Sequence, residues 1–237
     1  DGAEGQQSPR NLLASTVTDE LRLASNFRSK VVGISIKDRG GILPAGHLAN
    51  AAYWFDSKSG NWISSTFYMD ALPNWVNKFN GQDLATKYIK QDWNTLYPID
   101  TYVNSIEDDN IYEGTWPGEE KPVFPRKTSE LVKDAGLELI KTMPQGNTFT
   151  LDFAKDAIKN EQLGNTPDAQ TDFLCVSLSA TDYIGHRYSL SSVEIEDTYL
   201  RLDQDIADFL KYLDDTVGEG NYTFFLTADH AVSYNPL

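Results

Sequence analysis

Two pairs of aspartate and histidine are the residues of this chain best suited to hold a metal ion. Asp182 and His186 stand four positions apart, and Asp229 and His230 are adjacent. Carboxylate oxygen and imidazole nitrogen both ligate zinc, at roughly 2.0–2.2 Å. Because residues i and i+4 share one face of a helix, Asp182 and His186 can reach one ion if their segment is helical.

The adjacent pair has a stricter requirement. Neighbouring side chains of a regular strand point to opposite faces, so Asp229 and His230 can share an ion only where the chain has turned. The Ser-Tyr-Asn-Pro stretch that follows favours a turn. Either pair alone is more often a surface carboxylate beside a satisfied histidine. Together they are a stronger signal, because they use two of the three histidines in the chain.

Lys37 and Arg39 are candidates for binding an anion. In extended backbone, side chains at i and i+2 point the same way. Arginine binds phosphate oxygens as a bidentate fork and lysine as a point charge, so the pair suits a phosphate or a sulfate. Taken alone, two such cations after a strand more often mark a solvated turn.

The remaining histidine and the single cysteine are weaker candidates. His47 lies just beyond Lys37 and Arg39, and it is more often a structural residue than a third metal ligand. Cys175 sits inside an apolar run, which indicates a small buried hydrophobic residue.

The elements that must position these residues indicate an α/β fold. Apolar β-type runs occur at 31–36, 173–178 and 222–227, and each ends in polar, chemically active side chains. Such runs are typical of parallel strands that are covered on both faces. In open α/β sheets, ligands bind beyond the carboxyl ends of the strands. We therefore expect a largely parallel central sheet with helices on both faces, incomplete at both ends.

The remaining patterns predict helices, a hairpin and one irregular region. Helices are expected over residues 8–24, 74–79, 129–142, 150–162 and 195–213. Strands at 51–56 and 62–68 are expected to form a hairpin around Gly60. Residues 82–126 show no period, so this stretch is expected to be an insertion or a lid within one partial catalytic domain, 1–237; plain surface decoration is the alternative.

Composition narrows the classes of function. With 237 residues and a net charge of −15, the chain fits one large α/β domain or two small ones. Nucleic acid is bound by clustered Lys and Arg, so no nucleic-acid partner is expected. The acidic charge also disfavours an anionic membrane surface, and no apolar run of membrane-spanning length occurs. One cysteine excludes an internal disulfide framework and an all-cysteine zinc site.

These motifs resemble the alkaline phosphatase superfamily, and more narrowly the PafA-type, phosphate-irrepressible alkaline phosphatases of the Bacteroidetes group. The resemblance spans most of the chain and is weakest in the irregular region. The matching stretches are residues 8–23, 35–40, 43–47, 181–186, 196–203 and 227–230.

The resemblance implies a two-zinc site. Asp182 and His186 match two ligands of one zinc ion, and Asp229 and His230 match two ligands of the other. Three parts of the family's site have no match in this chain: an Asp ligand and a Thr nucleophile before it, and a His ligand after it. The chain is therefore expected to be an internal fragment that is inactive and binds zinc weakly or not at all.

The resemblance also implies the reaction. Lys37 and Arg39 match the cationic pair that holds the non-bridging phosphoryl oxygens, which favours hydrolysis of small phosphomonoesters through a phospho-Thr intermediate in the periplasm or outside the cell. Three alternatives remain: a phosphodiesterase or nucleotide pyrophosphatase of the same superfamily, a non-catalytic relative, and a manganese-dependent hydrolase or mutase.

Overall fold

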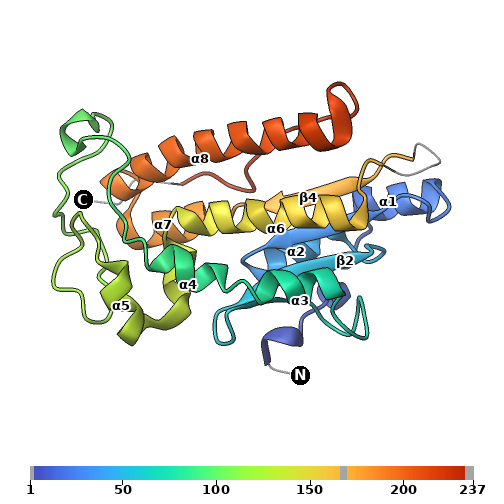
Figure 1. Cartoon of the computed structure of the whole chain (residues 1–237), viewed down its shortest axis with the longest axis horizontal. Coiled ribbons are helices and arrows are strands. Elements are labelled where there is room, and N and C mark those ends of the chain that lie inside the picture. The colour runs from blue at the N-terminus through green and yellow to red at the C-terminus, as the bar shows by residue number, and fades with distance from the viewer. Residues whose placement is uncertain (1–2, 166–169, 233–237) are drawn as a thin grey trace. The chain divides into compact units, whose positions relative to one another are not determined.

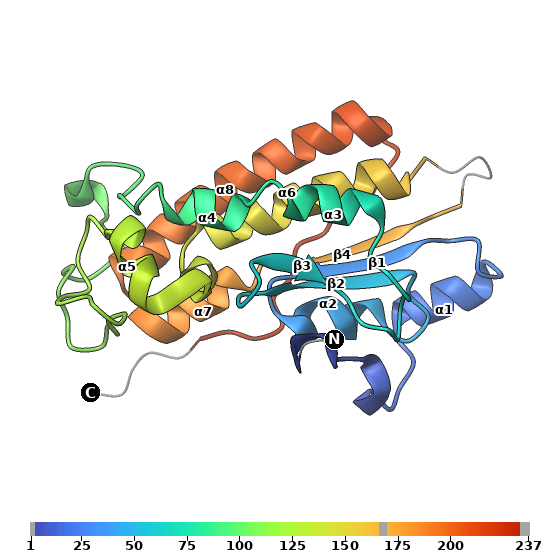
Figure 2. The same cartoon turned by 60° about the horizontal axis from the view of Figure 1, so that its bottom comes forward.

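The computed structural model describes residues 3–165 and 170–232, which form two compact units (Figures 1 and 2). The sheet unit takes the described parts of residues 1–83, 150–178 and 209–222. The helical unit takes the described parts of residues 84–149, 179–208 and 223–237. The candidate metal ligands fall in the helical unit, and the candidate anion-binding pair falls in the sheet unit.

All but two of the described helices lie wholly within one unit or the other. The sheet unit holds η1 (Ala3–Gly5), η2 (Pro9–Asn11), α1 (Val17–Ala24), α2 (Asp38–Ala45), α3 (Asn74–Asn80) and a π-helical turn, η5 (Asp214–Gly218). The helical unit holds α4 (Leu84–Ile89), η3 (Ile99–Thr101), α5 (Thr128–Ala135), η4 (Gly136–Thr142) and α7 (Ala180–Tyr188). Residues of α6 (Gln145–Glu161) and α8 (Val193–Leu213) contribute to both units. No helix in the described ranges is long and apolar enough to cross a membrane.

The sheet has four strands in the order β3-β2-β1-β4. They are β1 (Val31–Ser35), β2 (Ala51–Asp56), β3 (Asn61–Ile63) and β4 (Phe173–Ser177). β1 pairs in parallel with β2 and with β4, and β2 pairs antiparallel with β3. The largely parallel sheet and the hairpin are therefore confirmed, although β3 is shorter than predicted. β4 is at one edge of the described sheet, and its residues are half-buried rather than buried.

Helix α2 covers one face of the sheet. Val31 and Trp54 point to this face and form an apolar cluster with Ile42 and Ala45 of the helix. Trp54 is 1% exposed and Val31 is fully buried, so water is excluded from this contact. The cluster fixes the start of α2 directly beyond the carboxyl end of β1.

Helix α6 covers the opposite face. Because side chains alternate along β2, Tyr53 points away from α2 and meets Phe153 of α6 with ring centroids 5.3 Å apart. The same Phe153 stacks on Trp62 of β3 at 4.3 Å. Such aromatic pairs add about 0.5–1.5 kcal/mol beyond the area that they bury. Helices thus lie on both faces of the sheet, as expected.

The first predicted helix is shorter than expected. Ser8 does act as an N-cap, but only for η2, and its side chain accepts a hydrogen bond from the backbone N–H of Arg10. The longer helix starts at Val17, because Thr16 and Asp19 form a capping box there. Each of these two side chains accepts a hydrogen bond from the other residue's backbone N–H, which satisfies two donors that a helix start leaves open.

Two further predictions are corrected. The single helix predicted over 129–142 is divided, because Gly136 has a φ of 66° and ends α5 before η4 begins. No strand forms over 222–227, where Phe225 and Leu226 are 66% and 65% exposed. Apolar, β-rich composition predicts a strand only where a sheet edge accepts it, and this tertiary condition cannot be seen in the local sequence.

The irregular stretch 82–126 is held on helix α8 by buried polar contacts. The carboxylate of Asp197 is fully buried and accepts hydrogen bonds from Trp93 Nε1 at 2.7 Å, Leu96 N at 2.7 Å and Tyr102 Oη at 2.5 Å. These contacts replace the apolar stripe of a regular helix, which explains the absence of a period in the sequence. A role for this stretch as a lid stays a prediction.

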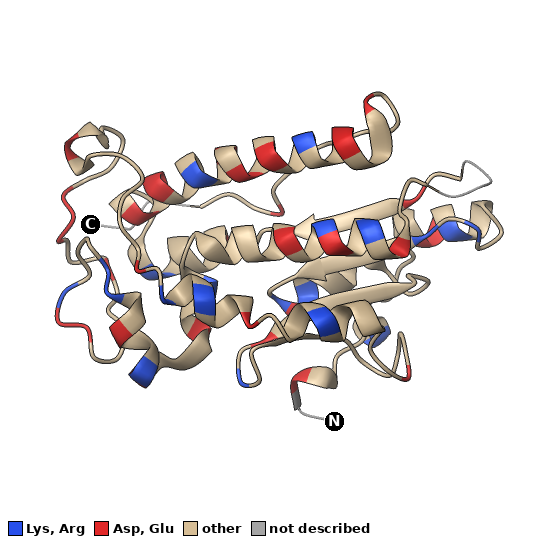
Figure 3. Ribbon diagram, in the orientation of Figure 1, with Lys and Arg blue, Asp and Glu red and all other residues tan. Residues whose placement is uncertain are grey.

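Buried ion pairs of Arg126 hold the end of the stretch 82–126 on helix α8. Arg126 is 2% exposed and donates from Nε to Glu194 Oε1 at 3.0 Å and from Nη1 to Glu119 Oε1 at 2.7 Å. Its guanidinium also lies 4.1 Å from the ring centroid of Tyr188. Helix α8 is markedly acidic along its length (Figure 3), and Arg126 is the cation that offsets its fully buried first-turn carboxylate, Glu194.

One guanidinium does not compensate every carboxylate around it. Burial, and then the charge of Glu194, raise the pKa of Glu113 to about 8. Asn110 Nδ2 donates to Glu113 Oε1 at 2.6 Å, whereas Glu113 Oε2 is buried without a hydrogen-bond partner. Glu113 therefore keeps its proton at neutral pH in the folded protein.

Replacing Gly33 with alanine tests the contact between β1 and α2. A Cβ at this position would lie 2.0 Å from the carbonyl oxygen of Gly41, which is backbone and cannot swing away. We expect Gly33→Ala to lower the free energy of unfolding by about 2–3 kcal/mol in urea titrations. Gly81→Ala is the matched control, because its nearest neighbour lies at 3.4 Å. Equal stability of the two variants would contradict this packing.

Replacing Glu113 with glutamine tests the buried acid. Its pKa is raised from 4.5 to about 8 in the folded protein, so the folded state holds this proton more tightly than the unfolded chain does. The stability that this proton gives is full below pH 4.5 and is lost as pH rises toward 8. Glutamine does not titrate, and we expect Glu113→Gln to flatten the fall of the melting temperature between these pH values. Glu130→Gln, at an exposed position on α5, serves as the control. An unchanged pH profile in Glu113→Gln would show that this carboxyl does not hold the proton.

Candidate functional site

Helix α7 positions the first Asp–His pair. Asp182 lies in its first turn and His186 in its last, and His186 Nε2 is 3.4 Å from Asp182 Oδ1. The predicted placement of the two residues on one helix face is therefore confirmed. The imidazole is 77% exposed and the carboxylate 22%, so the pair is open to solvent on the histidine side.

The second pair lies beside the first, because His230 contacts Asp182. His230 Nε2 lies 3.5 Å from Asp182 Oδ1 and 3.8 Å from Asp229 Oδ2. The backbone bends at Asp229 and neither residue is in a strand, which meets the condition that the chain has turned there. The Ser-Tyr-Asn-Pro stretch that favoured the turn begins at residue 233 and lies outside the described residues. The carboxylate of Asp182 thus contacts both imidazoles.

The donors of this cluster have the right chemistry for zinc. In a tetrahedral site, two ligand atoms of one zinc ion stand roughly 3.3 Å apart. Asp182 and His186 are 3.4 Å apart, close to that value, whereas Asp229 and His230, at 3.8 Å, are farther apart. Within the described part of the chain, however, no group of three or more His, Cys, Asp or Glu side chains is arranged to hold a metal ion. The assignment of these four residues as ligands stays a prediction.

The predicted geometry of the cation pair is wrong. Helix α2 begins at Asp38, so Lys37 is its N-cap residue and Arg39 lies in its first turn. The two side chains are therefore not at alternate positions of an extended backbone. Arg39 is 68% exposed, and its Nη1 lies 4.0 Å from Asp38 Oδ1. The helix start instead gives the pair a different advantage, since the N-terminus of a helix favours anions.

His47 is a structural residue, as predicted. Its Nε2 lies 2.9 Å from the carbonyl oxygen of Leu12, and its Nδ1 lies 3.2 Å from Asp19 Oδ2. Burial acts to raise the pKa of Asp19, but hydrogen bonds from Leu48 N–H, Thr16 and His47 outweigh it and hold this pKa below its usual value. Both ring nitrogens of His47 are therefore engaged away from any metal.

Cys175 is half-buried rather than buried as predicted, because it lies on β4, an edge strand of the described sheet. Burial raises the pKa of its thiol to about 12, so the reactive thiolate does not form at neutral pH. It is a free cysteine in β4.

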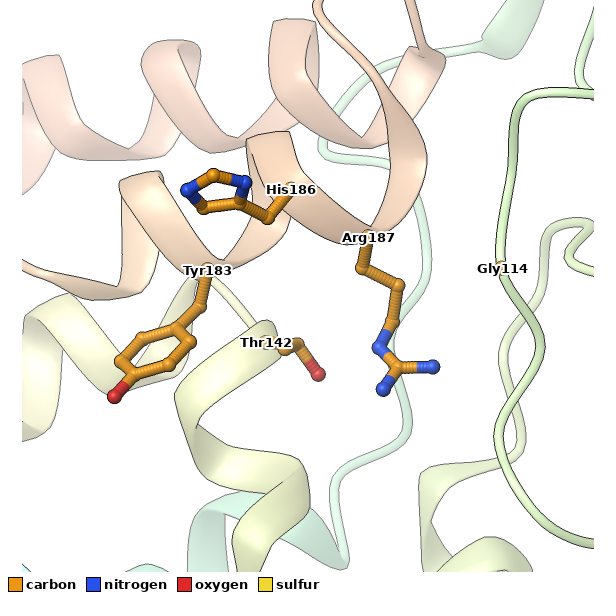
Figure 4. A pocket seen from close by; sticks show the side chains of 5 residues that line it. All are labelled: Gly114, Thr142, Tyr183, His186 and Arg187. Carbon is orange, nitrogen blue, oxygen red and sulfur yellow. The ribbon is translucent and has the colours of Figure 1, made fainter.

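A pocket beside the first pair was not predicted. It has a volume of about 350 Å³ and is lined by Gly114, Thr142, Tyr183, His186 and Arg187 (Figure 4). Tyr183 lies inside the sequence motif from Asp182 to His186, and Arg187 follows it directly on the same helix. Their position in and beside the motif was the only signal in the sequence.

Comparison with known protein families gives one match over most of the chain. Residues 18–236 match the family described as type I phosphodiesterase / nucleotide pyrophosphatase. This match includes all six residues singled out above as candidates for binding metal or phosphate.

Curated relatives have two kinds of name. A protein of Myroides odoratus named calcium-transporting ATPase is 66% identical, over 100% of this chain and 43% of that protein. Alkaline phosphatase PhoV of Synechococcus elongatus is 57% identical and alkaline phosphatase PafA of Elizabethkingia meningoseptica is 51% identical, each over 98% of this chain and 42% of that protein. The chain thus spans less than half the length of these relatives.

Solved structures agree with the fold. The crystal structure of wild-type alkaline phosphatase PafA matches with a TM-score of 0.88 and 50% identity, covering 92% of this chain and 42% of that chain. A variant of PafA with four substitutions, which include a lysine and an arginine two positions apart, matches with a TM-score of 0.88 and 49% identity over the same shares. The α/β fold and the resemblance to the alkaline phosphatase superfamily are confirmed.

Proposed function

Because this chain belongs to the type I phosphodiesterase / nucleotide pyrophosphatase family, we propose that it forms part of a metal-dependent phosphomonoesterase of the alkaline phosphatase kind. The observation that carries the proposal is the meeting of both Asp–His pairs at the carboxylate of Asp182. Relatives named alkaline phosphatase at 57% and 51% identity support it. Small phosphomonoesters are the proposed substrates, and a periplasmic or secreted location is part of the same proposal.

The four side chains would hold two zinc ions, one with Asp182 and His186 and the other with Asp229 and His230. Bound zinc supplies positive charge that stabilises the oxygens of the phosphoryl group and of the leaving group. Zinc sites use three or four protein ligands, so each ion needs more than the two residues named here. With no Thr nucleophile matched in this chain, the 237 residues alone are proposed to be inactive.

Lys37 and Arg39 would bind the non-bridging oxygens of the phosphoryl group. A phosphomonoester carries up to two negative charges there and a diester carries one, so two cations at a helix start favour the monoester. Their spacing equals that of the lysine and arginine replaced in the PafA variant.

The reaction would proceed in two displacements. A Thr hydroxyl attacks phosphorus, the bond from phosphorus to the ester oxygen breaks, and the alcohol leaves with a proton. Water then attacks the phospho-Thr, which releases inorganic phosphate and restores the hydroxyl. This course follows the family resemblance, and the described residues contribute the binding of charge rather than the nucleophile.

Hydrolysis of diesters or pyrophosphates is the second candidate function. The description of the matching family names both activities. The name of the Myroides odoratus relative adds ATP, whose hydrolysis is also a phosphoryl transfer. A non-catalytic relative and a manganese enzyme are the remaining alternatives, and the metal content of the full-length protein distinguishes both from the proposed zinc enzyme.

Replacing Arg39 with alanine separates the two candidate functions. In the zinc-loaded full-length protein, we expect Arg39→Ala to lower kcat/KM for a phosphomonoester such as phenyl phosphate by about 10²–10³-fold. The loss for a diester such as bis(4-nitrophenyl) phosphate should stay below about tenfold, because the diester has one charged oxygen fewer to bind. The same substitution at exposed Arg10 should change neither value. An equal loss on both substrates, or a wild-type protein that prefers the diester, would favour the diesterase.

A further inference from the structure

The pocket beside His186 adjoins the proposed metal site directly. His186 both contacts Asp182 and lines the pocket, so the pocket is within reach of a substrate held at the proposed metal ligands. Its volume of about 350 Å³ is at the lower end of known ligand pockets. It therefore has room for the small remainder of a phosphate ester, the part that leaves.

Arg187 makes one wall of the pocket electropositive. Its guanidinium lies 3.9 Å from the ring centroid of Trp116, and its Nη1 donates to the carbonyl oxygen of Thr115 at 2.8 Å. These contacts fix the plane of the guanidinium while leaving its charge without a carboxylate partner among the described residues. Arg126, in the same unit, is by contrast offset by two glutamates.

An unsatisfied donor of this arginine points to a missing acceptor. Arg187 Nε is buried and has no hydrogen-bond partner in the described structure. A buried N–H without a partner costs about 1–3 kcal/mol, and more when the group is charged. Figure 4 shows the guanidinium of Arg187 and the hydroxyl of Thr142 extending toward the same space. That space therefore offers an anion the charge of Arg187 and one hydroxyl, that of Thr142, which donates a long hydrogen bond of 3.4 Å to the carbonyl oxygen of Leu139.

We propose that this pocket binds a second anionic group, a phosphate or a carboxylate, on the leaving part of the substrate. The proposal rests on the proposed function and adds a preference for phosphomonoesters that carry such a second group. Arg187 is the residue that determines this preference, and Thr142 assists it. Local charge is needed for the purpose, because the net charge of −15 repels anions at long range.

The test compares substrates with and without the second anion in the zinc-loaded full-length protein. We expect Arg187→Met to lower kcat/KM by about 10- to 100-fold for 4-carboxyphenyl phosphate and for propane-1,3-diol bisphosphate, and by less than about threefold for phenyl phosphate. The two substrates that carry a second anionic group also tell whether carboxylate or phosphate fits better. Lys133→Met removes one charge from an exposed position on α5, outside the pocket, and should change none of the three values.

Two variants guard against a purely structural effect. Arg187→Lys keeps the charge and should retain part of the preference, while Thr142→Val keeps the shape and should reduce it by a few fold. If Arg187 only held the loop at Thr115 and Trp116, all three substrates would lose activity equally in every Arg187 variant. Such an equal loss in Arg187→Lys as well as in Arg187→Met would overturn the proposal, and the Arg187→Lys result decides this even if Arg187→Met folds poorly.

Binding gives a readout that does not depend on turnover. We expect wild-type protein to bind 3-phosphonopropionate more tightly than propylphosphonate in calorimetric titrations, and Arg187→Met to bind the two alike. Equal binding by the wild type would refute the second anion site. Absence of turnover on every ester, with the binding preference intact, would instead count against the proposed hydrolase and leave the pocket supported.

Discussion

The contact of Asp182 with two imidazoles is the interaction on which the rest of the site depends. Its carboxylate is 22% exposed and lies 3.4 Å from His186 and 3.5 Å from His230. A partly buried carboxylate is stabilised by hydrogen-bond donors or positive charge beside it, which the two imidazoles or a metal ion can supply. This stabilisation explains why His230, far along the sequence, lies beside Asp182. His186 contacts the same carboxylate and also lines the pocket.

Close packing and buried charge position the other candidate residues, each within its own unit. Gly33 lets α2 approach β1, which places Lys37 and Arg39 at the start of a helix directly beyond the strand. In the helical unit, Arg126 and Glu194 hold the irregular stretch whose residue Gly114 lines the pocket. Substitutions at either place are expected to destabilise the fold. A side chain at Gly33 would clash with backbone, and loss of Arg126 or Glu194 would leave a buried charge without its partner.

Features that depend on neighbouring residues alone were predicted well from the sequence. The spacing of Asp182 and His186 placed both on one helix face, and the apolar runs located three of the four strands, with β3 found only in part. Features that depend on tertiary contacts escaped prediction. Arg39 was expected in extended backbone because nothing near it shows that α2 begins at Asp38, and the pocket around Arg187 is built from three separate stretches of chain.

The bound metal content of the full-length protein tests most directly whether the two Asp–His pairs are ligands. Elemental analysis after dialysis should find about two zinc ions per chain in the wild type and one or fewer in Asp182→Asn. Asp134→Asn, which changes an exposed carboxylate on α5, should retain the wild-type content. Full zinc occupancy with unchanged affinity in Asp182→Asn, or manganese in place of zinc, or no metal in the wild type, would contradict the proposed site.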